Sequence, residues 1–240
     1  FQCGNSTEKS IEVLVYPSPV ASFSIEDACL GTSITPTESS TNGNIVNWSW
    51  DFGDGSGSSQ QSPQHSYSSY GDYSINLVVS TDFCCSDTEA QQVSIYDNPV
   101  ALFSVEDNCF EQTSSFSNLS SAPVSNITSY TWNMDGTILS TENPNYTFSN
   151  PGQYSVSLEV STPHGCTDQY QDVIEIFPLP SVGFTYNNPC RSNVVELSNT
   201  SSAVGSGNNL ESFLWDFNNG ETSDQRDLTY IYPSDGTYQI

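Results

Sequence analysis

Apolar and polar side chains alternate in several short runs along this chain. Residues 73–79 carry Tyr, Ile, Leu and Val at every second position, and residues 154–160 carry Tyr, Val, Leu and Val in the same arrangement. Residues 21–25 and 46–50 alternate in the same way. A two-residue period predicts strands with one buried face, and no stretch has the 3.6-residue period of an amphipathic helix.

Turn-forming residues separate these runs. Pro, Gly, Asn and Ser recur between them, and Asp54-Gly55, Asp135-Gly136 and Asn219-Gly220 each follow a run that carries a tryptophan. Such pairs favour tight hairpin turns in which the backbone adopts positive φ. Short strands joined by tight turns predict an all-β protein made of antiparallel β-sandwiches.

Three blocks of sequence recur in the same order. The first runs from an aromatic residue through a proline to a phenylalanine, the second contains a tryptophan, and the third begins with a Gly-x-Tyr triplet. The first occupies 16–23, 96–103 and 177–184; the second 48–55, 130–136 and 213–220; the third 71–79, 152–160 and 236–240. This self-similarity predicts repeats at 17–96, 97–177 and 178–240. We expect the last repeat to lack its final strand, and residues 1–16 to be the last strand of a preceding or neighbouring-chain repeat.

The first repeat carries a recognisable signature. Trp50-Asp-Phe-Gly-Asp-Gly55, followed by Gly71-Asp-Tyr73 with Leu77 and Val79 after it, resembles the signature of PKD domains. The other repeats match more loosely, and the resemblance covers essentially the whole chain. It implies tandem immunoglobulin-like, seven-strand sandwiches of a bacterial surface or secreted protein. Acidic arrays rich in Ser, Thr and Asn resemble cell-surface adhesins and filaments of the Bacteroidetes type.

The aromatic residues of these blocks are candidates for the core. Trp50, Trp132 and Trp215 lie in predicted strands, and Tyr73 and Tyr154 open the third block. Tryptophan also stacks on carbohydrate rings, but positions that match the strand period favour packing inside a sandwich. An exposed row of aromatics on one sheet face would instead indicate a polysaccharide-binding surface.

Charge and cysteine content narrow the choice of partner and compartment. Asp and Glu number 28 against 3 Lys and Arg, a formal net charge of −25. Binding to nucleic acid or anionic lipid needs clustered cations, so we expect neither partner. No apolar run approaches the roughly 18 residues of a membrane span. The cysteines indicate an oxidising compartment, and we expect a secreted or cell-surface protein.

Equivalent positions in the repeats suggest how the cysteines pair. Cys29 and Cys109 follow the opening strands, and Cys85 and Cys166 follow the third block. We predict the disulfides Cys29–Cys85 and Cys109–Cys166, with Cys84 as an alternative to Cys85.

Cys3 and Cys190 have no partner in their own repeats under that scheme. Cys3 stands in the position of a closing cysteine and Cys190 in that of an opening one. Two interpretations stay open: a window from a longer array, or head-to-tail assembly. In the second, residues 11–15 of one subunit add a strand to the third repeat of its neighbour, and Cys190 bonds Cys3 of the next chain.

Two kinds of surface site are candidates. Asp51, Asp54, Asp135 and Asp216 surround the turns after the tryptophans and are candidate calcium ligands, although Asp also suits such turns for backbone geometry alone. N-x-Ser/Thr triplets, which are candidate glycosylation sites, begin at Asn5, Asn47, Asn118, Asn126, Asn145 and Asn199.

The sequence gives little sign of catalysis. Its two histidines, His65 and His164, are expected in a packing role and a turn respectively, and no GxSxG, HExxH or P-loop motif occurs. We therefore expect no enzyme and no cofactor other than calcium. The sequence favours an extracellular structural or adhesive array, a semi-rigid stalk or filament subunit. Its partners would be further repeats, identical subunits or surface polysaccharide. The alternative is an accessory polysaccharide- or protein-binding region of a secreted hydrolase.

Overall fold

The computed structural model describes residues 9–187, 190, 194–203, 210–234 and 236–240, and every regular element in this part of the chain is a β-strand. The all-β prediction is confirmed. The described residues contain no helix with the length and apolarity that a bilayer crossing requires. The chain divides into two compact units. The first comprises Phe1–Ala101, Ser120–Ser129 and Val160–Asp168, and the second Leu102–Leu119, Tyr130–Glu159 and Gln169–Ile240.

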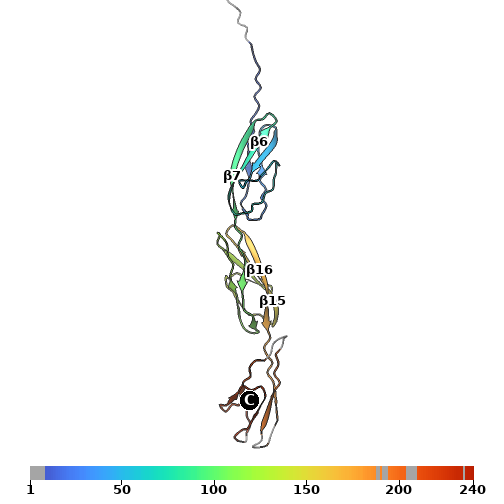
Figure 1. Cartoon of the computed structure of the whole chain (residues 1–240), viewed down its shortest axis with the longest axis vertical. Coiled ribbons are helices and arrows are strands. Elements are labelled where there is room, and N and C mark those ends of the chain that lie inside the picture. The colour runs from blue at the N-terminus through green and yellow to red at the C-terminus, as the bar shows by residue number, and fades with distance from the viewer. Residues whose placement is uncertain (1–8, 188–189, 191–193, 204–209, 235) are drawn as a thin grey trace, which may run out of the picture. The chain divides into compact units, whose positions relative to one another are not determined.

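The first repeat has a five-stranded sheet in the order β2-β7-β6-β4-β5. Its longest strands, β6 and β7, pair antiparallel along almost their whole length (Figure 1). β2 joins the edge parallel to β7, with Cys29 opposite Tyr96, and β1 pairs with β3. The strands are β1 Phe23–Ser24, β2 Ala28–Cys29, β3 Thr37–Glu38, β4 Ile45–Asp51, β5 Gly57–Ser58, β6 Gly71–Thr81 and β7 Ser86–Tyr96.

The second repeat repeats this plan. Its five-stranded sheet has the order β13-β12-β15-β16-β9, and β9 runs parallel to β16 with Cys109 opposite Phe177. β8 pairs with β11, and β10 with β14. The strands are β8 Phe103–Ser104, β9 Asn108–Cys109, β10 Ser114–Ser115, β11 Ser117–Asn118, β12 Ser129–Met134, β13 Thr137–Leu139, β14 Asn145–Tyr146, β15 Gly152–Ser161 and β16 Thr167–Phe177.

Residues 178–240, which we call the third repeat, form smaller sheets. One has the order β17-β18-β21, and the other pairs β19 with β20. The strands are β17 Phe184–Tyr186, β18 Val195–Asn199, β19 Trp215–Asp216, β20 Thr222–Ser223 and β21 Leu228–Tyr230.

The alternating runs bury one face as predicted, with one exception. Ile75, Leu77 and Val79 of β6 are fully buried, as are the corresponding residues Val156, Leu158 and Val160 of β15. In β4 the pairing with β6 shifts between Ile45 and Asn47, which is a β-bulge. Because of the bulge Ile45 packs against the core and Val46 is exposed, so Val46 does not share the face of Trp50.

Each predicted core tryptophan is buried and makes the same contacts. The indole N–H of Trp50 donates to Gln60 O at 2.9 Å, that of Trp132 to Thr141 O at 3.0 Å, and that of Trp215 to Gln225 O at 2.7 Å. A phenylalanine packs on each indole: Phe23 on Trp50, Phe103 on Trp132 and Phe184 on Trp215.

The two predicted core tyrosines lie at the edge of the core. Tyr73 and Tyr154 are half-buried rather than buried. The hydroxyl of Tyr73 donates to Ser69 O at 2.9 Å, and that of Tyr154 to Asn150 O at 2.8 Å. A tyrosine hydroxyl at the edge of a core usually finds a hydrogen-bond partner, and these two rings reach the rim to make one.

Candidate functional site

The two ends of the first sandwich carry different cysteines. The chain enters beside the start of β7, where the Ala21 N–H donates to Asp87 Oδ2 at 2.8 Å. We call this the near end; Cys85 lies there, in the turn between β6 and β7. Cys29 lies beside Tyr96, the last residue of β7, at what we call the far end.

The second sandwich places its cysteines in the same way. Cys166 precedes β16, at the near end, and Cys109 lies opposite Phe177, at the far end. The near-end turns also match, because Thr81 N–H donates to Cys85 O at 2.9 Å and Thr162 N–H to Cys166 O at 3.0 Å.

That match also fixes the position of Cys84. Cys84 has φ 62° and superposes on Gly165, whose φ is 79°. Cys85, not Cys84, is therefore the structural equivalent of Cys166.

The structure contradicts the predicted disulfides Cys29–Cys85 and Cys109–Cys166. It bonds Cys29 to Cys166, with 5.6 Å between their Cα atoms, inside the first compact unit. The reason is strand length: β7 is 11 residues long, and at about 3.3 Å per residue it separates Cys29 from Cys85 by roughly 35 Å. A disulfide spans no more than about 7 Å between Cα atoms.

The remaining cysteines of the described residues are free thiols. They are Cys84, Cys85, Cys109 and Cys190. The predicted partner of Cys190, Cys3, lies outside the described residues, so the intermolecular bond stays a prediction.

An aromatic stack accompanies the disulfide. The ring of Tyr96 lies on the ring of His164, with centroids 3.6 Å apart and planes 8° apart. The Tyr96 hydroxyl donates to Asp27 Oδ2 at 2.8 Å, and this hydrogen bond raises the pKa of the Tyr96 phenol. Sequence reasoning placed His164 in a turn, which is correct, and missed its ring contact.

A buried carboxylate completes the same region. Asp97 is only 3% exposed and accepts the backbone N–H of Val124 at 2.9 Å and of Ser125 at 3.2 Å, as well as the Ser125 hydroxyl. Burial works to raise the pKa of Asp97, but the hydrogen bonds from Ser125 and Val124 outweigh it and hold the pKa below its ordinary value. All three residues belong to the first compact unit.

Tyr16 makes the same stack at the near end of the first repeat. Its ring lies on Phe83 with centroids 3.6 Å apart and planes 11° apart. Phe83 and His164 hold equivalent positions two residues before Cys85 and Cys166. Ahead of Tyr16, the apolar side chains of residues 11–15 are exposed. We name the Cys29–Cys166 disulfide, the Tyr96–His164 stack and the buried Asp97 carboxylate together the junction site.

The predicted calcium ligands mainly hold their own turns. Asp51 accepts the Gly53 N–H at 2.9 Å, Asp54 the Ser56 N–H at 2.9 Å, and Asp216 the Asn218 N–H at 2.8 Å. Asp135 has φ 51° in its turn. Across the part of the chain that the structure describes, no three His, Cys, Asp or Glu side chains gather as metal ligands would. Calcium binding at these turns therefore stays an untested hypothesis from the sequence, and the described geometry does not favour it.

The histidine of the first repeat packs as predicted. The His65 ring stacks on Phe52 with centroids 4.2 Å apart, and its Nε2 lies 2.8 Å from Asp54 Oδ2. Of the triplet asparagines, Asn47, Asn126 and Asn145 are exposed, Asn118 and Asn199 are half-buried, and Asn5 lies outside the described residues.

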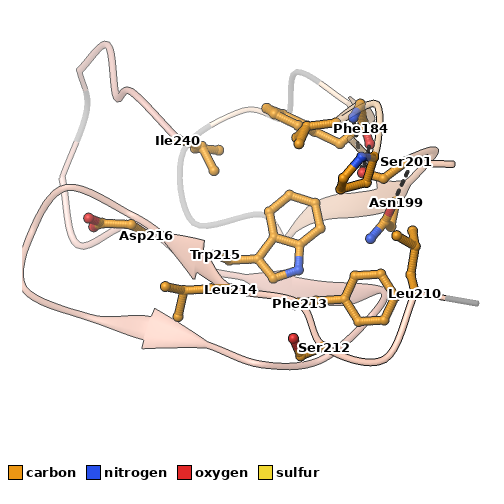
Figure 2. A pocket seen from close by; sticks show the side chains of 13 residues that line it. Phe184, Asn199, Ser201, Leu210, Ser212, Phe213, Leu214, Trp215, Asp216 and Ile240 are labelled. Atoms are coloured by element: carbon orange, nitrogen blue, oxygen red, sulfur yellow. Dashed lines mark hydrogen bonds between the residues drawn. The ribbon is translucent and has the colours of Figure 1, made fainter. Parts of the chain in front are cut away.

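The third repeat contains a hollow of about 280 Å³ beside its tryptophan. Figure 2 shows the Trp215 indole in the middle of the lining residues, with Phe184 and Ile240 beside it. In the first repeat β4 pairs with β6 as well as with β5, and Leu77 of β6 is the cross-strand neighbour of Trp50. Among the described residues of the third repeat, β19 pairs with β20 alone, so the hollow lies where Trp215 lacks such a neighbour, which argues against a built ligand site.

Two stretches of the chain match one protein family. The family model of the PKD domain matches residues 17–95 and 96–177, more than half of the chain. The chain belongs to the PKD domain family. The two matches span nearly the same residues as the first and second predicted repeats, and the resemblance to PKD domains seen in the sequence is thereby confirmed.

Relatives of these PKD repeats occur in larger proteins. The pre-pro-metalloprotease PrtV of Vibrio cholerae is 40% identical over 85 residues, which are 35% of this chain and 9% of that protein. A microbial collagenase of Vibrio alginolyticus is 55% identical over 53 residues, 21% of this chain and 6% of that protein. The chain thus spans less than a tenth of either curated relative.

Solved structures include single domains of the same family. The PKD1 domain of Vibrio cholerae PrtV has 37% identity and a TM-score of 0.31, and covers 33% of this chain and 98% of that domain. The PKD1 domain of Vibrio anguillarum Epp has 30% identity and a TM-score of 0.32, and covers 34% of this chain and 96% of that domain.

Proposed function

We propose that the chain is a non-catalytic accessory region of a secreted hydrolase, acting as a stiffened spacer between the enzyme and the parts that hold it in place. The observation that carries the proposal is the Cys29–Cys166 disulfide, which ties residues of two successive PKD repeats into one compact unit. A bond between repeats adds nothing to catalysis, but it restricts bending at the linker, which is what a spacer requires.

Two further contacts act in the same direction. The Tyr96–His164 stack joins residues of the two repeats, and the hydrogen bonds of the buried Asp97 tie the residue after Tyr96 to the second repeat at the same place. A linker as short as the one that follows Tyr96 already limits motion. The similarity to PKD repeats of a Vibrio metalloprotease and a Vibrio collagenase supports the placement beside a secreted hydrolase.

Distance measurements between the repeats test the spacer. Spectroscopic labels on non-natural residues at two exposed positions, Tyr70 and Ile138, report the spread of distances between the first and second repeats. We expect a narrow distribution for the oxidised chain and a broader one for Cys29→Ser. The exposed Cys84→Ser variant is the matched control and should leave the distribution unchanged. A distribution that is equally broad in all three chains would contradict the proposal.

A second candidate is a stalk or filament subunit at the cell surface, and the exposed segment 11–15 favours it. This segment presents Ile, Val and Val at alternate positions, which is the pattern of a strand that can pair with the open edge of a sheet. Strand addition to another copy would produce fibres whose number rises with protein concentration. Electron microscopy tests this directly: fibres that disappear on Val13→Asp support the second candidate, and single particles at all concentrations contradict it.

A further inference from the structure

Two free thiols occupy the same places as the two halves of the observed disulfide. Cys85 superposes on Cys166, since both end a matched near-end turn. Cys109 superposes on Cys29, since each lies opposite the last residue of its repeat's final strand. Neither can bond the cysteine of its own repeat, because an 11-residue strand separates the two ends.

An independent contact shows that the near end of the first repeat is built as a junction. The Tyr16–Phe83 stack has the same spacing as the Tyr96–His164 stack beside the disulfide, and nearly the same plane angle. Tyr16 occupies the position of Tyr96 in the repeat pattern. A residue that flanks Cys85 therefore holds the aromatic side chain that precedes the first repeat, as His164 holds Tyr96, which precedes the second.

The same backbone contacts surround Cys109. Phe110 N–H donates to Phe177 O at 2.7 Å, as Leu30 N–H donates to Tyr96 O at 2.9 Å beside Cys29. Gln112 N–H donates to Cys109 O at 3.1 Å, as Thr32 N–H does to Cys29 O at 2.9 Å. Cys109 is half-buried, in a backbone setting that matches the bonded Cys29.

We infer that Cys85 and Cys109 are half-cystines of a serial staple, in which the far-end cysteine of each PKD repeat bonds the near-end cysteine of the next. The disulfide partner of Cys85 is the far-end cysteine of a repeat placed before it. The disulfide partner of Cys109 is the near-end cysteine of a complete repeat placed after it. This inference does not depend on whether the array serves a hydrolase.

The chemistry is ordinary thiol oxidation. One S–S bond forms, two S–H bonds break, and two protons are released while two electrons pass to an oxidant. The oxidant is a disulfide, carried by a thiol–disulfide oxidoreductase or a small-molecule disulfide, which is reduced to two thiols through a mixed-disulfide intermediate.

Insertion of one repeat into the full chain tests the Cys109 half. A second copy of residues 97–177 is inserted between Phe177 and Pro178, which places the inserted copy of Cys166 after the original Cys109. In this variant we expect the inserted His164 to stack on Phe177. We expect the inserted Asp97 to accept hydrogen bonds from Val124 and Ser125 of the inserted copy. Peptide mapping without reduction is expected to recover Cys109 linked to the inserted Cys166, and alkylation of Cys109 is expected to fall about tenfold or more against the original chain.

The matched control carries Cys166→Ser in the inserted copy alone. It should return Cys109 to full alkylation, while the original Cys29–Cys166 bond, present in every variant, reports that the junction has folded. In the insertion variant without Cys166→Ser, full alkylation of Cys109 together with an intact Cys29–Cys166 bond overturns the inference.

A second insertion tests the Cys85 half separately. A copy of residues 17–96 inserted between Tyr16 and Pro17 places its Cys29 before the original Cys85. We expect these two to be linked, and Cys84→Ser to leave the link in place. If Cys85 stays free, or if the unmodified chain yields a Cys29–Cys85 peptide, the staple is wrong.

Discussion

The first and third repeats each contain a phenylalanine packed on a tryptophan, a pair that we call the aromatic kernel, but they differ in how far this pair is covered. Phe23 packs on Trp50 with ring centroids 5.1 Å apart, and Phe184 packs on Trp215 at 5.3 Å, both edge-on. Yet Phe23 is 3% exposed and Phe184 is 37% exposed. The kernel is formed by residues close to the tryptophan and opening phenylalanine, whereas sealing it takes the long strands that the first repeat has in β6 and β7. Local blocks thus specify the contact between the two rings, and the long β6–β7 hairpin of the first repeat adds burial that the described part of the third repeat lacks.

Removing the tryptophan should have the largest effect in a sealed repeat. Trp50→Ala deletes a side chain that is 2% exposed, together with its hydrogen bond to Gln60. We expect the first repeat to lose about 3–5 kcal/mol of unfolding free energy. Trp215→Ala should cost the third repeat less, because its kernel is more open to water. Denaturant unfolding, with hydrogen exchange to assign each transition, measures both.

The control for this pair lies on neighbouring positions of β6. Leu77 is fully buried and Val78 is exposed, so Leu77→Ala should cost about 2–5 kcal/mol and Val78→Ala no more than about 0.5 kcal/mol. Equal losses for Trp50→Ala and Trp215→Ala would mean that β6 and β7 contribute less burial than their contacts suggest.

A glycine exchange sharpens the comparison at the turn after the tryptophan. Gly53 has φ 77°, and a Cβ placed there would lie 2.6 Å from Ser74 O of β6. The third repeat has Asn218 at the equivalent position, at φ 54°. Gly53→Asn should therefore destabilise the first repeat by roughly 2 kcal/mol, because a backbone atom is the obstacle. Asn218→Gly should change the third repeat by less than about 1 kcal/mol.

Thermal unfolding of the two reciprocal variants provides the measurement. A small loss for Gly53→Asn would show that β6 can shift away from the turn without cost, and the close approach would then have no structural role.

The junction site differs from its counterpart one repeat later. Asp97 stands where the next repeat has Pro178, which has no carboxylate to accept hydrogen bonds. Asp97→Asn removes charge-assisted bonds to Val124 and Ser125 and should cost about 1–2 kcal/mol. Asp224→Asn, at an exposed aspartate, is the matched control and should be close to neutral.

Acid should act on the same carboxylate. The pKa of Asp97 in the folded protein lies below its ordinary value of 3.8, because its hydrogen bonds outweigh the effect of burial. Its contribution to stability is therefore fully present above about pH 4 and is lost as the pH falls through the lowered pKa. Unfolding free energy measured between about pH 5 and pH 2 should fall less steeply in Asp97→Asn than in the wild type. Parallel curves would contradict this role.

The sequence predicted the parts of the fold that depend on local pattern. Alternation predicted the buried faces of β6 and β15, and the repeated blocks predicted the tryptophan cores. The cysteine pairing was wrong because it depends on where Cys29 lies relative to β7, and the parallel pairing of β2 with β7 leaves no periodic trace in so short a strand. One signal was available: Cys85 precedes a long alternating run, and a run of that length places the two ends of a repeat far apart.

The turn carboxylates should give the smallest effect. Asp51 Oδ1 accepts the Gly53 N–H, and an asparagine side-chain oxygen can accept the same bond. Asp51→Asn, alone or with Asp216→Asn, should therefore change the unfolding free energy by less than about 0.5 kcal/mol. The melting temperature should be the same in calcium and in chelator, since binding to the folded state alone would raise it by mass action. A melting temperature that rises with calcium in the wild type, and no longer does so in the double variant, would instead assign these aspartates to a cation. The turns of the first and third repeats would then differ from simple hairpins in having a ligand.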